Sequence, residues 1–243
     1  MKISLIIPMY NESSIIADTA KTVFEYMSAN FEDYEVIFVD DGSKDNSAEV
    51  ANSLALPNVR VSGYGGNKGK GAAVRHGMLE ASGDVIMFTD ADLAYGTDVI
   101  KRVYDIFSGD ESIKIVTGSR NLSADGYEGY TALRKLMSKV YIKVLCIVGG
   151  FKLSDSQCGC KAFCSSAAKD IFSRCEVNGF AFDFEAILWA GKLGYPITEM
   201  PVKIINHRES KVNVIKDTIK MLRDLRRIKK SVKAKAKSEK SGK

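Results

Sequence analysis

The sequence has no apolar run long enough to cross a membrane. None of its 243 residues belong to an uncharged stretch approaching the roughly twenty residues that a bilayer-spanning helix requires. The first apolar run, Ile3 to Ile7, is too short for a secretory signal and predicts a first strand instead. We therefore expect neither a transmembrane helix nor a signal peptide in this chain.

Cysteine and histidine are too few and too irregularly spaced for a zinc site. The chain has 5 cysteines and 2 histidines. Cys158, Cys160 and Cys164 lie close together, but their spacing is not that of a zinc motif and no histidine is near them. The odd number of cysteines favours free thiols of the kind kept reduced in the cytosol.

The body of the chain has no net positive charge. Between Arg226 and Lys243 nine Lys or Arg and one Glu give +8, whereas the whole chain carries +5, so residues 1–225 carry −3. The basic segment has no aromatic side chains on which bases could stack, so we expect no nucleic-acid binding. From Lys229 to Lys243 the low-complexity mixture of Lys, Ser and Ala predicts a disordered tail.

What is present is an alternation of strand patterns and helical patterns. Strands are predicted over residues 3–7, 34–39, 59–61, 85–88 and 113–117, with helical stripes between them. This order predicts an α/β fold with a mostly parallel central sheet covered by helices on both faces. Further helices are predicted over 133–148, 182–193 and 214–228, and a strand over 197–205 that Pro201 confines to an edge.

Two carboxylates one residue apart, Asp90 and Asp92, directly follow the apolar run from Val85 to Phe88. Carboxylates at the carboxyl end of a strand suit a hard divalent cation that also bridges to substrate phosphates. On its own the triplet also occurs as an ordinary solvated turn.

Polar residues follow other predicted strands as well. Asn11 and Glu12 follow the first strand, Asp40 and Asp41 the second, and Arg120 the fifth. Each has a plainer explanation, as a helix cap or a turn. Together they indicate a ligand site along one edge of the sheet.

A glycine-rich run from Asn67 to Gly71 precedes a predicted helix. The backbone N–H groups of such a loop can cradle a phosphate. The run is neither a Walker loop nor a Rossmann fingerprint, so by itself it does not name a nucleotide-binding fold.

Taken in order, these segments resemble a known family. Pro8-Met9-Tyr10-Asn11-Glu12, Val39-Asp40-Asp41-Gly42-Ser43, Asn67-Lys68-Gly69-Lys70-Gly71-Ala72, Asp90-Ala91-Asp92 and Gly118-Ser119-Arg120 resemble the family 2 inverting glycosyltransferases with the GT-A fold. The segments 155–161 and 182–185 look like the polyprenyl-phosphate sugar synthases, in particular the dolichyl-phosphate β-glucosyltransferase branch. The resemblance implies a GT-A domain over residues 1–212, with the helix 133–148 inside it, then a basic amphipathic helix over 213–228 and the tail 229–243.

The resemblance also implies a role for each matching residue. Pro8, Tyr10, Glu12, Phe38 and Asp40 would hold the nucleobase and ribose, with Asn11, Lys68 and Ala91 also in the donor site. Asp90 and Asp92 would hold Mg²⁺ or Mn²⁺ against the donor diphosphate, and Arg120 would approach the donor diphosphate or the acceptor phosphate. Gln157, Asp183 and Glu185 would line the sugar pocket and the acceptor mouth, and Arg208 and Lys211 would meet the acceptor phosphate. The implied catalytic set is Asp92, Arg120, Asp183 and Glu185.

Two departures from the family pattern stand out. Ala94 stands where some relatives place a third metal-contacting side chain, so water or backbone must fill that place. The segment 206–211 is shorter than in many relatives, which bears on the role given to Arg208.

The implied reaction is one direct displacement. A phosphate oxygen of a polyprenyl phosphate attacks the anomeric carbon of a nucleotide sugar, with UDP-glucose favoured, and the nucleoside diphosphate leaves with inversion. Three alternatives stay open. They are mannosyl transfer from GDP-mannose to dolichyl phosphate, transfer to a glycan hydroxyl with Asp183 or Glu185 as base, and a nucleotide-sugar-binding regulatory module without turnover.

A polyprenyl acceptor implies work at a membrane surface. Residues 133–148 and 214–228 combine apolar faces with Lys and Arg flanks, which is typical of interfacial helices, and the basic tail would attract anionic lipid. We expect a peripheral protein on the cytoplasmic face of a membrane, with a membrane-anchoring partner protein as a further option. The plainer alternative is that both helices pack on the body.

Overall fold

A central sheet organises the part of the chain that the structure describes. The computed structural model describes residues 1–206 and 214–241, and for residues 214–223 and 240 it describes the backbone alone. Within these ranges the strands form one seven-stranded sheet in the order β3-β2-β1-β4-β6-β5-β7. The strands are β1 (Ile3–Met9), β2 (Tyr34–Asp40), β3 (Val59–Gly63), β4 (Val85–Phe88), β5 (Ile115–Ser119), β6 (Lys161–Cys164) and β7 (Ile197–Pro201).

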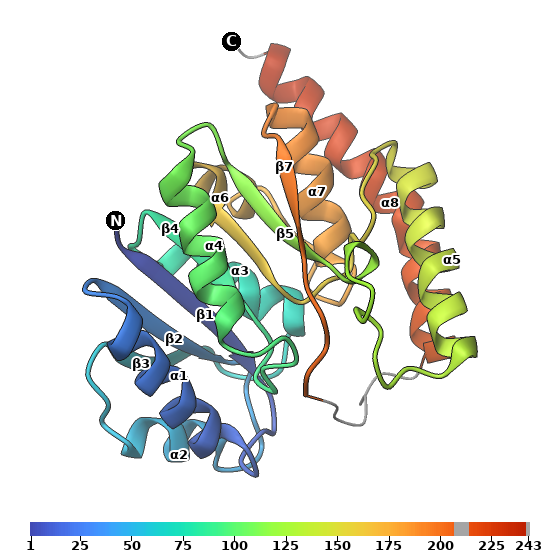
Figure 1. Ribbon diagram of the computed structural model, residues 1–243. Helices are drawn as coiled ribbons and strands as arrows, with labels where there is room; N and C mark the ends of the chain where they lie inside the picture. Colours follow the sequence, from blue (N-terminus) through green and yellow to red (C-terminus); the bar gives the residue numbers. More distant parts are fainter. Residues whose placement is uncertain (207–213, 242–243) are drawn as a thin grey trace.

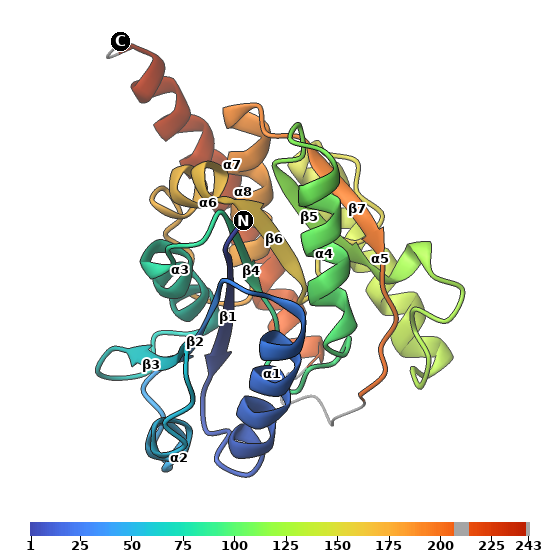
Figure 2. The same ribbon diagram turned by 60° about the vertical axis from the view of Figure 1, so that its left-hand side comes forward.

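Helices cover both faces of this sheet (Figures 1 and 2). They are α1 (Ile16–Asn30), α2 (Ser47–Ser53), α3 (Lys70–Glu80), α4 (Asp98–Gly109), α5 (Ala132–Gly149), α6 (Ser165–Phe172), α7 (Phe182–Leu193) and α8 (Val214–Ser241), with a 3-10 turn η1 (Arg120–Leu122) after β5. Among the described residues, none of the helices is both long and apolar enough to span a bilayer. All five cysteines are free thiols.

The strand pairing is mostly parallel, as the sequence predicts. β1 pairs in parallel with β2 and β4, β2 with β3, and β5 with β7. β6 is antiparallel to both β4 and β5, so it separates the two parallel groups. The predicted edge strand is β7, which ends at Pro201.

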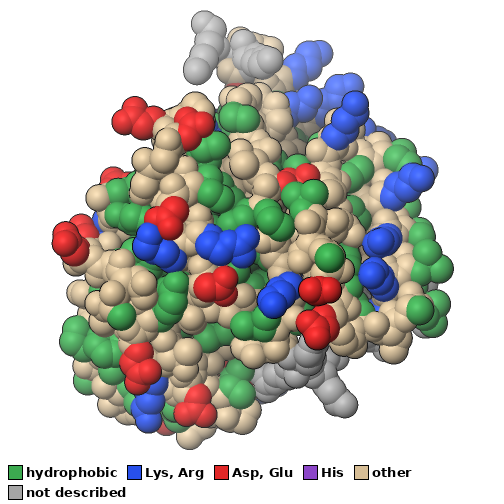
Figure 3. Space-filling model, in the orientation of Figure 1, with side chains coloured by type: hydrophobic (Ala, Val, Ile, Leu, Met, Phe, Trp, Pro, Cys, Tyr) green, Lys and Arg blue, Asp and Glu red, His purple; other side chains and the backbone are tan. Residues whose placement is uncertain are grey.

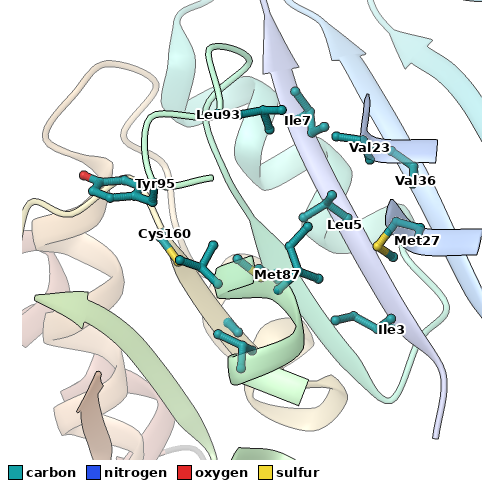
Figure 4. Close-up of a cluster of buried hydrophobic side chains, with 14 of the residues drawn as sticks. Ile3, Leu5, Ile7, Val23, Met27, Val36, Met87, Leu93, Tyr95 and Cys160 are labelled. Atoms are coloured by element: carbon teal, nitrogen blue, oxygen red, sulfur yellow. The ribbon is translucent and has the colours of Figure 1, made fainter. Parts of the chain in front are cut away.

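The core lies in two layers because successive strand residues point to opposite faces of the sheet. Ile3, Leu5 and Ile7 of β1 pack against Val23 and Met27 of α1 in one layer (Figure 4). Ile6, between them, belongs to the other layer, which α3, α6 and α7 complete. The apolar strand runs therefore fix which face each helix covers.

The C-terminal helix α8 runs beside α5 and α7 (Figure 1). Leu225, Ile228 and Val232 are buried there, and Ala236 packs against the same layer. Because this stripe continues the helical spacing past residue 229, packing favours a helix over a random chain. The predicted disordered tail from Lys229 is therefore wrong, since α8 extends to Ser241.

The predicted interfacial role of residues 214–228 also needs correction where their side chains are described. Leu225 and Ile228, two members of the predicted lipid-facing stripe, are buried against the body. The plainer alternative therefore holds for this part of α8. The other members of the stripe, Ile215, Ile219 and Leu222, lie outside the described side chains.

Candidate active site

The predicted ligand-binding residues lie in segments that follow the ends of neighbouring strands. Met9 of β1 pairs with Asp40 of β2, and Ile6 of β1 pairs with Phe88 of β4. The segments that follow β1, β2 and β4 therefore leave the sheet along one edge, which we call the rim. Arg120 follows β5, which antiparallel β6 separates from β4, so it enters the rim from two strands away.

The loops after β1 and β2 are cross-linked by hydrogen bonds. The backbone N–H of Asn11 donates to Ser43 Oγ at 3.0 Å, and the N–H of Lys44 donates to Asn11 Oδ1 at 2.8 Å. The N–H of Ser43 in turn donates to Asp40 Oδ1 at 3.1 Å. Asn11 has a φ of 53°, a left-handed conformation that asparagine tolerates better than most residues. These bonds hold Asp40 and the segment around Glu12 in fixed positions.

Asp41 fixes the glycine-rich loop between β3 and α3. Its buried carboxylate accepts hydrogen bonds from Tyr64 Oη at 2.7 Å, Asn67 Nδ2 at 2.8 Å, and the backbone N–H groups of Lys68 and Gly69 at 2.9 and 2.8 Å. Burial and this carboxylate raise the pKa of Tyr64. Asp41 is therefore a loop-positioning residue, a role that the sequence did not assign to it.

Asp90 and Asp92 lie in a tight turn at the end of β4. The N–H of Leu93 donates to the Asp90 carbonyl at 3.0 Å, and the N–H of Ala94 donates to Asp92 Oδ1 at 3.1 Å. The ammonium of Lys70 forms an ion pair with Asp90 Oδ1. A Cβ on Gly159 would lie 2.3 Å from Asp90 Oδ2, so only glycine leaves room for this carboxylate.

A second ion pair lies beside the first. Lys161 Nζ is 2.8 Å from Asp183 Oδ1 and donates to the Cys158 carbonyl at 2.7 Å. Burial raises the pKa of Asp183, while the charges of Lys161 and Lys70 oppose that rise. Burial alone would lower the pKa of Lys70, but the carboxylate of Asp90 and, to a smaller extent, those of Asp183 and Asp92 raise it. Acidic and basic groups thus alternate from Lys161 to Asp90.

Arg120 forms a buried ion pair with Asp155. Its Nε and Nη2 donate to the two carboxylate oxygens at 2.6 and 3.0 Å, and its backbone N–H donates at 3.2 Å. The guanidinium also lies 5.1 Å from the ring centre of Tyr127. Two of its side-chain donors are therefore committed to Asp155. A contact between Arg120 and a phosphate stays a prediction.

Three predicted site residues are placed elsewhere than the rim. Phe38 is fully buried (0% exposed) in the core layer, because its position in β2 points it away from the loops, so its predicted nucleobase contact is wrong. Glu185 is 2% exposed and accepts the backbone N–H groups of Glu176 and Val177 at 2.9 and 2.7 Å. Its predicted place at the acceptor mouth is wrong as well, because both bonds hold the loop before α7. The side chain of Ala91 is also in the core.

The other predicted residues divide into two groups. Pro8, Tyr10 and Gln157 are partly exposed and Lys68 is exposed. The donor-binding roles of Pro8, Tyr10 and Lys68, and the role of Gln157 at the sugar pocket and acceptor mouth, stay predictions. Arg208 and Lys211 lie outside the described residues.

The rim fits a divalent cation that both the protein and a substrate phosphate would coordinate. In the described part of the chain no cluster of three or more His, Cys, Asp and Glu side chains could hold a metal alone. Asp90 and Asp92 supply carboxylate oxygens only, which are the ligands Mg²⁺ and Mn²⁺ prefer, and Mg²⁺ is commonly held by one or two carboxylates plus substrate phosphates. The two carboxylates therefore suit a divalent cation that is also coordinated by a diphosphate.

The family follows from comparison with known proteins. The model of the family described as glycosyl transferase family 2 matches residues 4–172, which cover β1 to α6 and every rim loop. The chain belongs to glycosyl transferase family 2. It is therefore a glycosyltransferase, and the family predicted from its motifs is confirmed.

Named relatives of this glycosyltransferase match nearly the whole chain. It is 33% identical to the dolichyl-phosphate beta-glucosyltransferase of Dictyostelium discoideum, over 93% of the chain and 73% of that protein. It is 30% identical to the protein of that name from Homo sapiens, over 92% of the chain and 74% of that protein. The match to that of Saccharomyces cerevisiae is 28% identical, over 92% of the chain and 72% of that protein.

Solved structures share the fold of the glycosyltransferase. Glucosyl-3-phosphoglycerate synthase from Mycobacterium tuberculosis in complex with Mn²⁺, UDP and glucosyl-3-phosphoglycerate superimposes with a TM-score of 0.66 at 17% identity, over 92% of this chain and 79% of that one. The complex of the same enzyme with Mg²⁺ and UDP also gives 0.66, at 19% identity and the same coverage. The predicted GT-A fold is confirmed.

Proposed function

We propose that this glycosyltransferase moves glucose from UDP-glucose to a polyprenyl or dolichyl phosphate, with inversion and with Mg²⁺ or Mn²⁺. The observation that carries the proposal is the similarity, along 93% of the chain, to a protein named dolichyl-phosphate beta-glucosyltransferase. The arrangement of Asp90, Asp92 and Lys70 at the rim supports it, because carboxylates and an ammonium side by side suit a cation and a diphosphate.

In this proposal the rim holds the donor. The loops after β1 and β2, which hydrogen bonds cross-link, would bring Tyr10, Glu12 and Asp40 to the nucleoside. Asp90 and Asp92 would hold the divalent cation, which when bound stabilises the negative charge that grows on the leaving diphosphate. Lys70 adds a positive charge at the same point.

The acceptor in this proposal needs no strong general base. A phosphate monoester has a second pKa near 6, so it is largely ionised at neutral pH and attacks without giving up a proton in the same step. Asp183, paired with Lys161, would then position groups around the sugar. The raised pKa of Asp183, caused first by burial, favours a second candidate, transfer to a glycan hydroxyl with Asp183 as base.

Incubation with a panel of donors and acceptors tests the proposed function. The purified protein is mixed with UDP-glucose, other UDP-sugars or GDP-mannose, and with polyprenyl phosphate or a soluble saccharide. We expect a product in the organic phase with UDP-glucose and polyprenyl phosphate. Product from GDP-mannose alone would replace the donor, and nucleotide release only with the saccharide would favour the hydroxyl acceptor. Donor binding without turnover would favour a regulatory module.

We further propose that α5 places the transferase on the anionic cytoplasmic face of a membrane. The helix buries Ile142 and Leu145, yet Leu133, Leu136, Val140 and Ile147 are 67, 60, 54 and 71% exposed. Apolar and basic side chains mix along this edge of the molecule (Figure 3). A groove of about 650 Å³ between α5 and residues 151–154 adds Lys139, Lys143 and Lys152. A membrane-anchoring partner protein is a further proposed attachment.

Flotation with liposomes tests the proposed membrane surface. Replacing Leu136 and Val140 by Glu is expected to lower binding to anionic vesicles at least tenfold, because burying each apolar side chain is worth about 1.5–3 kcal/mol. The matched control is Leu79→Glu, an exposed leucine on α3. Equal flotation of all three proteins would contradict the role of α5. Replacing the exposed Arg226, Lys230 and Lys233 by Glu tests α8 separately, because the buried Ile228 and Val232 stay in place. Unchanged binding would mean that these basic side chains play no part.

A further inference from the structure

Lys70 forms an ion pair with one of the two carboxylates that are proposed to hold the metal. Its ammonium forms an ion pair with Asp90 Oδ1, and the two side chains are 25% and 32% exposed. Lys161 already pairs with Asp183, the next carboxylate along. The charge of Lys70 is therefore directed mainly at Asp90.

The backbone around Lys70 is fixed, whereas its side chain is long. Lys70 is the first residue of α3, and the N–H of Gly69 before it donates to Asp41 at 2.8 Å. The N–H of Gly71 after it donates to the Asn178 carbonyl at 2.7 Å. A Cβ on Gly69 would lie 2.5 Å from that carbonyl oxygen, so this close approach requires glycine. The backbone stays in place while the four-carbon side chain of Lys70 can turn from one anion to another.

A divalent cation alone meets a competitor at this site. To bind both Asp90 and Asp92 it must displace an ammonium that is already paired, and the displaced ammonium is left beside a new positive charge. When a diphosphate arrives with the cation, Lys70 gains a phosphate partner and the repulsion is offset. Cation and diphosphate therefore favour each other at the rim.

We propose that Lys70 is a built-in counter-ion that holds Asp90 in the empty enzyme and moves to the donor diphosphate when the cation binds. This inference rests on the proposed metal-dependent function. It makes Lys70 a positioning residue that couples cation binding to donor binding. Such coupling is reciprocal, so UDP should tighten Mn²⁺ binding by the same factor by which Mn²⁺ tightens UDP binding.

Mn²⁺ binding to the Lys70→Met variant tests the proposal without any turnover. Free Mn²⁺ is followed by electron paramagnetic resonance, with and without UDP. Without UDP we expect the variant to bind Mn²⁺ about tenfold more tightly than the wild type, and with UDP we expect the gain from the nucleotide to fall by about tenfold. Lys101→Met is the matched control, since Lys101 also pairs with an aspartate, Asp105, but on the exposed face of α4.

The sign of the change separates the proposal from simpler roles of Lys70. If the ion pair only supports the fold, or if Lys70 only attracts the diphosphate, the variant binds Mn²⁺ alone equally or more weakly, and the proposal is overturned. Lys70→Arg keeps a counter-ion and is expected to retain the wild-type coupling, which serves as the test if Lys70→Met does not fold. Absence of Mn²⁺ binding to the wild type with UDP would overturn the metal role itself. If the wild type binds Mn²⁺ in the presence of UDP and Lys70→Met binds Mn²⁺ with the same affinities as the wild type, only the role of Lys70 is overturned.

Discussion

Replacing Asp92 by Asn is expected to lower kcat by about a thousandfold or more while the protein stays folded. Asparagine has nearly the same shape and can still accept the hydrogen bond from the N–H of Ala94. It lacks the charge that would hold a divalent cation, and a metal contributes several kcal/mol to charge stabilisation in such transition states. The rate of sugar transfer at saturating Mg²⁺ measures the effect, and circular dichroism checks the fold.

The control for this variant is Asp105→Asn. Asp105 lies on the exposed side of α4, outside the rim loops, and forms an ion pair with Lys101. We expect its kcat to stay within about twofold of the wild type, since surface substitutions away from special features have small effects. An Asp92→Asn enzyme of comparable activity, or near-normal wild-type activity in the presence of a chelator, would contradict the metal role.

Replacing Asp155 by Ala is expected to cost about 3–5 kcal/mol in the free energy of unfolding, because it leaves the buried charge of Arg120 without its partner. For a chain of this size that corresponds to a fall in Tm of roughly 6–20 °C. Thermal unfolding at pH 7 measures the change. The double variant Arg120→Met with Asp155→Leu removes both charges and is expected to recover most of the loss.

The stabilisation from Asp155 should depend on pH in one direction. Burial alone would raise the pKa of Asp155, but the hydrogen bonds and charge of Arg120 hold it below its ordinary value. The carboxylate therefore contributes fully above the unfolded pKa of about 3.9, and its contribution is lost as the pH falls through the lower folded value. The gap in stability between the wild type and Asp155→Ala should be constant from pH 5 to 7 and shrink below pH 4. A gap that stays constant to lower pH would contradict the pairing.

Much of the fold could be predicted from apolar periodicity. The runs that start at Ile3, Tyr34 and Val85 are strongly apolar and became β1, β2 and β4 in one parallel group. β6 has only four residues, and its antiparallel insertion between β4 and β5 depends on long-range pairing that so short a segment does not reveal. The prediction of a disordered basic tail was wrong for a related reason. Its composition suggested disorder, but Val232 and Ala236 continue a helical stripe of apolar residues that packs against the core.

The candidate site was predictable as a set of segments but not as a set of contacts. The sequence placed Asp90 and Asp92 after a strand, yet nothing in the spacing reveals that Lys70 reaches Asp90 from the first turn of α3. In the same way, Asp40 and Asp41 look alike as neighbours, but only Asp41 turns inward to hold the glycine-rich loop. Each missed residue lay within a motif that was noticed, and its partner came from a distant part of the chain.

Two predicted site roles were corrected because the side chains concerned are buried. Phe38 follows the alternation of β2 and points into the core, so it contacts Ile7 and its layer and cannot reach a base. Glu185 lies on the side of α7 that faces the loop before it, where two backbone N–H groups need an acceptor. A motif match shows which residue type stands at a position. The direction of its side chain depends on how the whole strand or helix packs.

A crystal grown with Mn²⁺ and UDP would test the central claim most directly, because the anomalous scattering of Mn²⁺ locates the cation without assumptions about the protein. We expect one strong peak within coordination distance of the Asp92 carboxylate, bridging to the diphosphate, with Lys70 turned from Asp90 toward a phosphate oxygen. UDP bound away from the end of β4, or bound at the rim with no Mn²⁺ at Asp90 and Asp92, would contradict it.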